Sequence, residues 1–437
     1  MQPKVSVVIP SFNSIAYYKE CIESVLNQSL KDIEILCIDA HSSDGTLELI
    51  QEYALKDKRI KLILSEQKSY GYQMNLGIQK ACGEYLGIVE SDDYIDTFMY
   101  EKLLKTAQKY KACIVKANMV DFKHKEKIRI FNPHNITSCK SLYNKILNHE
   151  DLRVFTQTAI MNPSGIFKLD FLKQNEIYHT QTSGAAFQDT AFWFKSTLLA
   201  QKMIFLNEAL YYYRRDNNTS SCNHIPYKRA LNLGKEYDSI KDFLNEHLEF
   251  KHFIPLVSYL RFLGYNWVLS NILDKDKILF LQTFQKDFKE LDEKGELDKG
   301  FFSKYQIEKL ERIIENPNEF YENVASKPKG AVKEVKKSLA YVLGGEIIEA
   351  KSFTKILKLP FILYQTIKNI PPSSSLKLES FSDYYEALAL YNHLSYRLGS
   401  QLLKSYEKRY KGTLFLFPFK VLLIYRQFVQ SRRRIYG

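Results

Sequence analysis

The sequence predicts an α/β domain followed by a mostly α-helical C-terminal region. Short apolar runs rich in β-branched residues alternate with helix-periodic segments over about the first 90 residues, a pattern typical of right-handed βαβ units and a parallel sheet. From about residue 228 onward the periodicity is almost purely helical. With 437 residues, 45% of them hydrophobic, the chain is long enough for about two to three domains with buried cores. This composition excludes disordered, collagen-like and disulfide-scaffold classes.

The first strands and helices follow one another in a regular order. Strands are expected at 5–9, 33–38, 60–64 and 85–89, and helices at 17–27, 46–54 and 72–81. Polar residues follow the strands at Asn13, Asp39 and Glu90–Asp93. Ligands of open α/β sheets bind at the carboxyl ends of strands, so this coincidence is a functional signal, although Asn, Asp and Ser also favour turns.

Three segments are expected along the chain. They are an α/β domain at 1–225, a helical domain at 226–325 and a basic amphipathic helical module at 326–437. The module contains an internal repeat, because Leu339–Ala350 matches Leu394–Ser405 and a Pro-containing apolar run follows each copy. Two copies are too few for a solenoid, so the sequence predicts a paired amphipathic module.

Charge is distributed unevenly along the chain. Residues 1–325 carry 42 Lys and Arg against 43 Asp and Glu, whereas residues 326–437 carry 20 against 7. The net charge of +12 therefore belongs wholly to the last segment. This distribution disfavours a protein that wraps nucleic acid and describes a near-neutral body with a cationic tail.

The expected compartment is the reducing cytoplasm. The six cysteines form no CxxC pair and show no metal-like spacing. The first residues lead into a strand without the features of a signal peptide, and no uninterrupted 18-residue apolar run occurs. The closest run, 253–269, contains Arg261 and is better interpreted as a buried helix. We therefore expect a protein without a membrane span.

Three carboxylates crowd into the motif Glu90–Asp93 at a strand end. Like-charge repulsion makes such a cluster costly unless a cation lies among them, and oxygen ligands suit Mg²⁺ or Mn²⁺. The alternative is an acidic loop that caps the next helix through Asp93 or Asp96. Taken alone, the motif leaves both interpretations open.

Five segments together resemble family 2 glycosyltransferases with the GT-A fold. They are Val7–Asn13, Ile38–Thr46, Asn75–Tyr85, Glu90–Asp93 and Phe187–Asp189. Each segment is weak singly, but their order and spacing are specific, and the match covers about the first 225 residues. The resemblance implies a Rossmann-like nucleotide-sugar-binding domain and an inverting transfer of the sugar.

The resemblance implies a nucleotide pocket at the strand ends. Asp39 would lie beside the base and ribose, and Asn75 would open the helix behind a loop at Lys68–Tyr72. This chain departs from the family at Ala40, where a second aspartate is common, and at His41, where glycine is usual. The implied nucleotide-binding residues are Pro10, Ser11, Asn13, Asp39, Asn75, Ser91 and Asp92.

The resemblance also implies the reacting groups. The ligands of a Mg²⁺ or Mn²⁺ ion would be Asp92, the neighbouring Asp93 and Glu90. Glu90 stands where the family usually has its first aspartate. Asp189 matches the catalytic base, although the residue alone would more readily be a cap of a helix at 190–199. Arg214 or Arg215 is expected either to reach the pyrophosphate or to form exposed ion pairs.

The expected function is transfer of a sugar, from a UDP-sugar by preference, to a glycan or lipid-linked acceptor in lipopolysaccharide or capsule synthesis. The segment 326–437, with basic clusters at Lys408–Lys411 and Arg432–Arg434, is expected to dock on the anionic inner face of the cytoplasmic membrane. An ordinary helical subdomain or a contact between copies of the chain is the alternative.

Two other functions stay open. A sugar-1-phosphate nucleotidyltransferase is disfavoured because no Gly-rich arginine loop directly follows the first strand. A catalytically silent, membrane-associated assembly protein remains because Ala40 and Glu90 depart from the family pattern.

Overall fold

The computed structural model describes residues 2–126, 128–217, 225–350, 352–369, 377–407 and 417–436. Contacts divide the chain into two compact units, Met1–Gly264 and Tyr265–Gly437. The three-part division stays a prediction about which segments fold independently.

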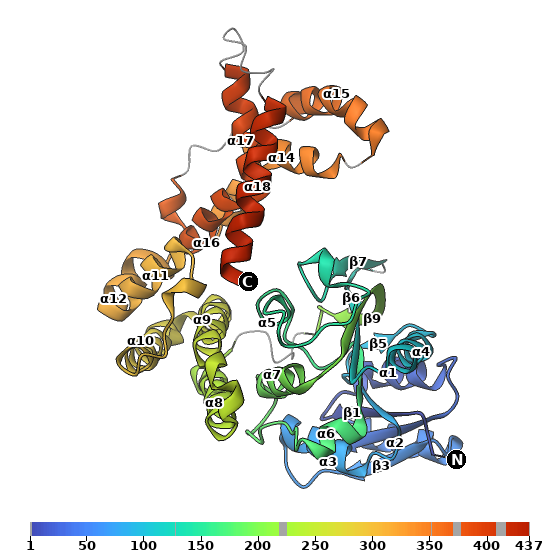
Figure 1. Ribbon diagram of the computed structural model, residues 1–437. Coiled ribbons are helices and arrows are strands. Elements are labelled where there is room, and N and C mark those ends of the chain that lie inside the picture. Colours follow the sequence, from blue (N-terminus) through green and yellow to red (C-terminus); the bar gives the residue numbers. More distant parts are fainter. Residues whose placement is uncertain are drawn as a thin grey trace. The chain divides into compact units, whose positions relative to one another are not determined.

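A single sheet forms the centre of the first unit (Figure 1). Among the described residues it has nine strands, in the spatial order β3-β2-β1-β4-β8-β6-β9-β5, with β7 paired to β6. The strands are β1 (Val5–Ser11), β2 (Ile33–Asp39), β3 (Ile60–Leu64), β4 (Tyr85–Ile88), β5 (Tyr94–Ile95), β6 (Ile114–Lys125), β7 (Ile128–His134), β8 (Gly165–Lys168) and β9 (Met203–Arg214).

Only part of this sheet is parallel. Strands β1 to β4 run parallel, as the alternating pattern predicts, and Val8 of β1 pairs with Leu36 and Ile88. Strand β8 is antiparallel to both β4 and β6, β9 is parallel to β6, and β5 is antiparallel to β9. The parallel arrangement predicted for about the first 90 residues is therefore confirmed, and the strands after β4 make the whole sheet mixed. Parallel neighbours require a crossover, whereas β6 turns directly into β7 as a hairpin.

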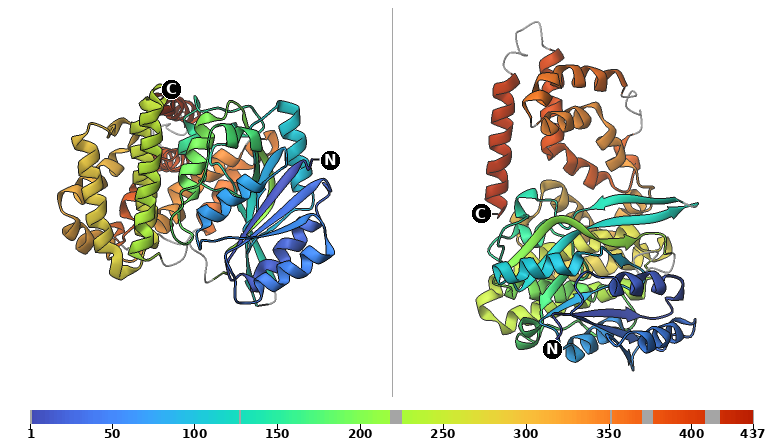
Figure 2. Two further views of the ribbon diagram at one scale, coloured as in Figure 1. Left: turned by 90° about the horizontal axis from the view of Figure 1, so that it is seen from below. Right: turned by 90° about the vertical axis from the view of Figure 1, so that its right-hand side faces the viewer.

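Helices cover both faces of the sheet, as the views in Figure 2 show. Alternate residues of a strand point to opposite faces, so Val7 and Val8 belong to two different cores. The Val7 core includes Tyr18 of α1, and the Val8 core includes Met74 of α3. The helices are α1 (Ile15–Leu26), α2 (Thr46–Lys56), α3 (Tyr70–Lys80), α4 (Met99–Tyr110), α5 (Arg153–Thr156), α6 (Leu169–Gln174), α7 (Asp189–Leu199) and α8 (Tyr227–Glu246).

Helix α3 begins two residues earlier than its periodicity predicts. The Ser69 hydroxyl accepts a hydrogen bond from the backbone N–H of Tyr72 at 3.3 Å and so caps the first turn. Asn75 therefore lies in the middle of α3 and does not open it, which corrects the prediction.

Helices are the main regular structure of the second unit within its described residues. Helix α9 (Ile254–Asn271), which corresponds to the apolar run predicted to be a buried helix, ends in this unit. No helix within the described ranges combines the length and the apolar character that a bilayer crossing requires. The other helices are α10 (Lys277–Glu293), α11 (Lys304–Glu315), α12 (Pro317–Phe320), α13 (Ala331–Lys337), α14 (Leu339–Glu349), α15 (Phe353–Asn369), α16 (Tyr384–Ala389), α17 (Leu394–Glu407) and α18 (Phe417–Tyr436).

The two copies of the sequence repeat form α14 and α17, which pack against each other (Figure 1). A Cβ atom on Gly344 would lie 1.6 Å from the carbonyl oxygen of Ser395, and one on Gly399 would lie 1.8 Å from that of Ala340. Gly344 and Gly399 occupy equivalent repeat positions, as do Ala340 and Ser395, so the contact is reciprocal. The predicted pairing of the copies is confirmed. The basic cluster Lys408–Lys411 lies outside the described residues.

Candidate active site

Asp39 joins the carboxyl ends of β1 and β2. One carboxylate oxygen accepts from the hydroxyls of Ser11 at 2.8 Å and Ser42 at 2.7 Å, and the other accepts from the Ser42 backbone N–H at 2.7 Å. The Asp39 side chain is fully buried. Pro10 is likewise buried, and it pairs with Ile38 of β2. This arrangement fixes the strand edge, and the nucleotide contacts of Pro10, Ser11 and Asp39 stay predictions.

Two residues just beyond these strands adopt left-handed backbone conformations. Asn13 has φ 53° and His41 has φ 58°. Asn13 accepts a hydrogen bond from the backbone N–H of Ser43 at 2.9 Å through its side-chain oxygen. A left-handed φ is least costly for glycine, which explains why the family usually has glycine at the position of His41. Both residues are exposed, as a ligand-contacting turn requires.

Two side-chain amides on α3, those of Gln73 and Asn75, hold the backbone near the carboxyl ends of the strands. The Gln73 amide donates to the carbonyl oxygens of Ser11 at 2.9 Å and Ile38 at 2.7 Å. The Asn75 amide donates to the His179 carbonyl and its oxygen accepts from the His179 N–H, each at 2.8 Å. Both side chains are buried. Asn75 thus holds the chain at His179, and its nucleotide contact stays a prediction.

The side chains of the acidic motif Glu90–Asp93 point in different directions. Glu90 is half-buried and accepts a hydrogen bond from the Tyr70 hydroxyl at 2.8 Å. Burial, together with the charges of Asp92 and Asp189, raises the pKa of Glu90 to about 8. Asp92 is half-buried and accepts from the Asn217 amide at 2.7 Å, and the Ser91 hydroxyl bonds to that of Ser14 at 2.8 Å.

Asp93 points into the protein. Its two oxygens accept from the Arg214 backbone N–H and the Tyr211 hydroxyl, each at 2.7 Å. Burial, followed by the charge of Asp92, raises the pKa of Asp93 well above its usual range. The pairing of β5 with β9 brings Asp93 to these partners. Within the described ranges no three acidic, His or Cys side chains assemble around a metal position. The metal-binding roles of Glu90, Asp92 and Asp93 stay predictions.

Arg214 supports this motif from inside the protein. Its guanidinium donates to the Asp92 carbonyl at 2.7 Å and pairs with Glu20 at 2.6 Å, and only 5% of the residue is exposed. The neighbouring Arg215 is exposed and pairs with Asp121 at 3.0 Å. The expectation of an exposed ion pair is therefore confirmed for Arg215 and wrong for Arg214.

Asp189 lies in the first turn of α7, directly after the N-cap residue Gln188. Burial raises the pKa of the Asp189 carboxyl to about 6, while its own backbone N–H and the charge of Lys116 oppose the rise. Asp189 is close enough to Glu90 for its charge to raise the pKa of Glu90. Folding therefore brings together the acidic motif and Asp189, which lie far apart in the sequence.

Lys116 is a buried cation beside this carboxylate. Its ammonium group donates to the carbonyl oxygen of Met161, and 6% of the residue is exposed. Burial lowers the pKa of Lys116 to about 7, and the charge of Asp189 acts against that shift. Carboxylates with raised pKa values next to a polar strand edge are typical of catalytic sites.

Comparison with known proteins shows the family to which the chain belongs. Residues 6–192 match the sequence model of glycosyl transferase family 2. The chain is 30% identical over 220 residues to glycosyltransferase GlyG of Streptococcus pneumoniae, covering 49% of this chain and 72% of GlyG. The chain belongs to glycosyl transferase family 2.

A second relative and a second family model match this glycosyltransferase beyond its first unit. The chain is 26% identical over 337 residues to cholesterol galactosyltransferase of Borreliella burgdorferi, covering 71% of this chain and 91% of the relative. Residues 265–430 match a domain of unknown function, DUF8374. Among solved structures, S. aureus TarS 1–349 in complex with UDP-GlcNAc aligns with a TM-score of 0.43 and 20% identity, over 63% of this chain and 86% of that one.

Several residues that support the candidate site lie outside the matched family region. Tyr211, Arg214 and Asn217 come from β9 and the residues after it, and they hold Asp92 and Asp93. Their Tyr/Arg-rich segment is visible in the sequence, but its contacts are not. Lys116 and Gln73 carry no such signal, because one lysine or glutamine in an ordinary element does not reveal burial.

Proposed function

We propose that this glycosyltransferase transfers a sugar, with inversion, from a UDP-sugar to a lipid-linked or glycan acceptor in the synthesis of a surface polysaccharide such as lipopolysaccharide or capsule. The observation that carries the proposal is that Tyr70 of α3 links Glu90 and the loop before Asp189. Its hydroxyl donates to Glu90 at 2.8 Å, and its backbone N–H donates to Gly184, in the loop that leads to Asp189, at 2.9 Å. The first turn of α7 supplies the base, and the strand ends supply the groups for the nucleotide.

The proposed chemistry is a direct displacement. Asp189 accepts the proton of the acceptor hydroxyl as that oxygen forms a bond to the anomeric carbon. The bond from the anomeric carbon to the diphosphate oxygen breaks at the same time, and the nucleoside diphosphate leaves with the electron pair. One displacement inverts the anomeric centre. A carboxyl with a pKa of about 6 is largely ionised at neutral pH and still basic enough to take part in proton transfer.

A divalent cation fits part of the acidic motif. Asp92 accepts a hydrogen bond from Asn217 through one carboxylate oxygen. The negative charges of Asp92 and Asp189 disfavour a negative charge on Glu90. A cation relieves such crowding, so Asp92 and Glu90 are the residues that would hold Mg²⁺ or Mn²⁺. The bound ion would neutralise charge on the departing diphosphate. The inward-facing Asp93 contributes by fixing the motif.

The acceptor class is supported by a relative and by the second unit. Cholesterol galactosyltransferase carries a lipid in its name, and its match spans 71% of this chain, which is more than the first unit alone. We propose that the enzyme acts at the inner face of the cytoplasmic membrane. The second unit supplies the means of docking there.

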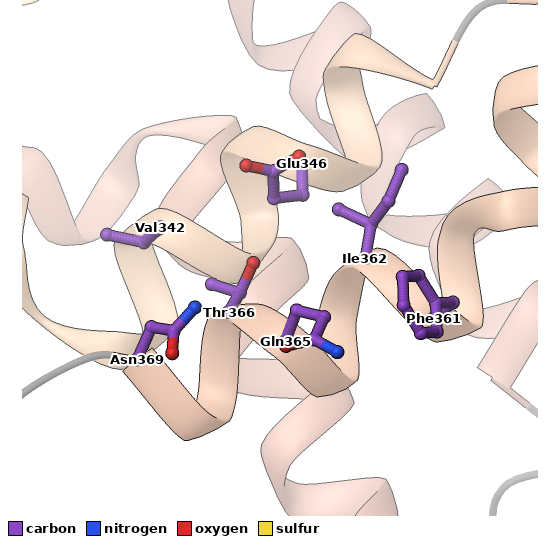
Figure 3. A pocket seen from close by; sticks show the side chains of 7 residues that line it. All are labelled: Val342, Glu346, Phe361, Ile362, Gln365, Thr366 and Asn369. Carbon is purple, nitrogen blue, oxygen red and sulfur yellow. The ribbon is translucent and has the colours of Figure 1, made fainter.

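Helices α15 and α18 present apolar side chains to solvent. The exposed residues are Phe361, Tyr364 and Ile367 on α15, and Phe419, Leu422, Leu423 and Tyr425 on α18. Phe361 also lines a hollow of about 400 Å³ between α14 and α15 (Figure 3). Neither helix contains Asp or Glu, whereas both contain Lys or Arg. Exposed apolar side chains on helices whose own charged residues are all cationic are complementary to an anionic bilayer.

The first experiment tests the reaction. UDP release is measured with UDP-glucose, UDP-galactose and UDP-N-acetylglucosamine, in the presence of Mn²⁺ or Mg²⁺ and a membrane-lipid extract as acceptor. Asp189→Asn is expected to lower kcat by about 10²- to 10⁴-fold while UDP binding is retained, because the base takes part only in the reaction. Undiminished transfer by Asp189→Asn overturns the assignment of Asp189 as the base. If no UDP-sugar supports transfer and another nucleotide-sugar binds, the proposed UDP-sugar donor is overturned.

The second experiment tests membrane docking with the full chain. Co-sedimentation is measured with phosphatidylglycerol and phosphatidylcholine vesicles. The double variant Phe419→Ser/Leu423→Ser is expected to bind phosphatidylglycerol at least about tenfold more weakly, because each side chain loses apolar burial. Leu55→Ser is the matched control, because Leu55 is 90% exposed on α2. Equal vesicle binding by the parent, the double variant and Leu55→Ser overturns the proposal. It is also overturned if sedimentation velocity shows a dimer of the parent that is lost only in the double variant.

A further inference from the structure

Glu236 is a buried carboxylate on α8, beyond the residues that match the family model. None of its surface is exposed to solvent. One oxygen accepts a hydrogen bond from the Thr180 hydroxyl, and the other accepts from the backbone N–H of Ala191 at 3.1 Å. Glu236 therefore contacts both the loop before α7 and the first turn of α7, the helix that carries Asp189.

The bond to Ala191 satisfies a helix terminus. The first N–H groups of a helix have no partner within it, and a side chain at the N-cap usually accepts from one of them. Gln188, at the N-cap of α7, makes no such bond. Its amide instead donates to the Thr182 hydroxyl at 2.7 Å and accepts from the Ala186 N–H at 2.6 Å. Glu236 thus supplies the cap from a different helix.

The loop before α7 is held at its other side by α3. The Ser69 hydroxyl donates to the Thr182 carbonyl at 2.6 Å, and the Tyr70 backbone N–H donates to the Gly184 carbonyl at 2.9 Å. A Cβ atom on Gly71 would lie 1.9 Å from the Thr180 carbonyl oxygen, so the loop packs directly on the helix backbone. Helix α3 holds the loop from one side, and Glu236 holds it from α8.

The backbone next to Asp189 is strained. Phe187 has φ 68°, a left-handed conformation that is costly for an aromatic residue and persists only when the surroundings enforce it. Burial raises the pKa of Glu236 to about 7, so this carboxylate also costs stability. A Ser or Asp at position 188 would cap α7 at lower cost. The strained backbone and the buried carboxylate both lie beside the first turn of α7, which sets the direction of the Asp189 side chain.

We propose that Glu236 is a positioning residue for sugar transfer, which fixes the first turn of α7 and so the direction of the Asp189 carboxylate. This proposal rests on the function proposed for Asp189. Glu236 itself touches neither substrate nor reacting atoms. Its effect is exerted on the reaction step and not on the binding of the nucleotide.

The test uses the full chain with the variants Glu236→Gln and Glu236→Ala. Asp242→Asn, an exposed change on the same helix, is the matched control. The measurements are kcat and KM for the active UDP-sugar, by UDP release, and the Kd of UDP with Mn²⁺. We expect kcat to fall about tenfold or more in Glu236→Gln and further in Glu236→Ala, with KM and Kd within about twofold of the parent and the control unchanged.

The conservative variant separates positioning from folding. Glutamine keeps one acceptor oxygen for Thr180 or Ala191, whereas alanine keeps none, so a graded loss in kcat is expected. An unchanged kcat in Glu236→Gln overturns the proposal. Loss of UDP binding in Glu236→Gln also overturns it, because that residue would then hold the whole domain together. If Glu236→Ala does not fold, Glu236→Gln decides alone.

A double variant distinguishes failure of this proposal from failure of the proposed function. If Glu236 acts through Asp189, Asp189→Asn/Glu236→Gln is expected to be no slower than Asp189→Asn alone. Losses that multiply show that Glu236 acts independently and overturn the inference. An active Asp189→Asn overturns the assigned base itself, whereas an inactive Asp189→Asn beside a fully active Glu236→Gln overturns only the inference.

Discussion

The strand edge of the first unit and the α14–α17 crossing of the second both depend on close contacts, but of opposite kinds. At the edge, Asp39 and Asp93 are buried and each accepts several hydrogen bonds. At the crossing, Gly344 and Gly399 admit a neighbouring carbonyl because they have no side chain. The edge uses costly polar groups to orient side chains for chemistry, whereas the crossing uses small residues only to pack two helices.

The largest expected effect tests the crossing. Gly344→Ala places a methyl group where the Ser395 carbonyl oxygen lies, so the helices must separate. We expect a loss of about 3 kcal/mol or more in the free energy of unfolding of the second unit, measured by chemical denaturation followed by circular dichroism.

Gly345→Ala is the control for this change. A Cβ atom on Gly345 meets nothing within 4 Å, and alanine favours helix by about 0.5–1 kcal/mol over glycine. The control is therefore expected to be neutral or slightly stabilising. A Gly344→Ala protein as stable as the control contradicts the reciprocal crossing.

A smaller effect is expected at the strand edge. The Tyr211 hydroxyl donates to Asp93 at 2.7 Å and accepts from the Glu90 backbone N–H at 3.1 Å. Tyr211→Phe leaves both groups without this partner and is expected to cost about 1–3 kcal/mol and to lower activity, since Glu90 and Asp93 flank Asp92, which is proposed to hold the metal ion. Tyr212→Phe, whose ring stacks on Tyr94, is the control. Equal stability of the two variants speaks against a bonded motif.

The smallest effect concerns pH. The pKa of Asp189 is raised to about 6 in the folded protein, above its usual value of about 3.9, so the ionised carboxylate is disfavoured by folding. This cost is absent below about pH 4 and complete above about pH 6. The Tm of Asp189→Asn relative to the parent is therefore expected to rise between about pH 4 and about pH 7. A pH-independent difference contradicts the burial of this charge.

Local patterns in the sequence determined the first half of the sheet. Strand β3 begins and ends at the residues expected, and β2 differs only by including Asp39, because short β-branched runs bounded by polar residues identify such strands without tertiary information. The family motifs likewise predicted Glu90, Asp92 and Asp189 as site residues. The repeat predicted the pairing of α14 with α17, since both copies carry the same small residues.

Tertiary structure alone decided which polar groups face the site. Asp93 and Asp92 are neighbours in the sequence, but the pairing of β5 with β9 directs Asp93 inward to Tyr211. Asn75 and Glu236 became anchors of the loop and helix around Asp189 through contacts with residues distant in sequence. Such contacts depend on strand order and helix packing, which no local pattern encodes. The sequence by itself therefore determined the chemistry available, and folding determined the direction in which each group points.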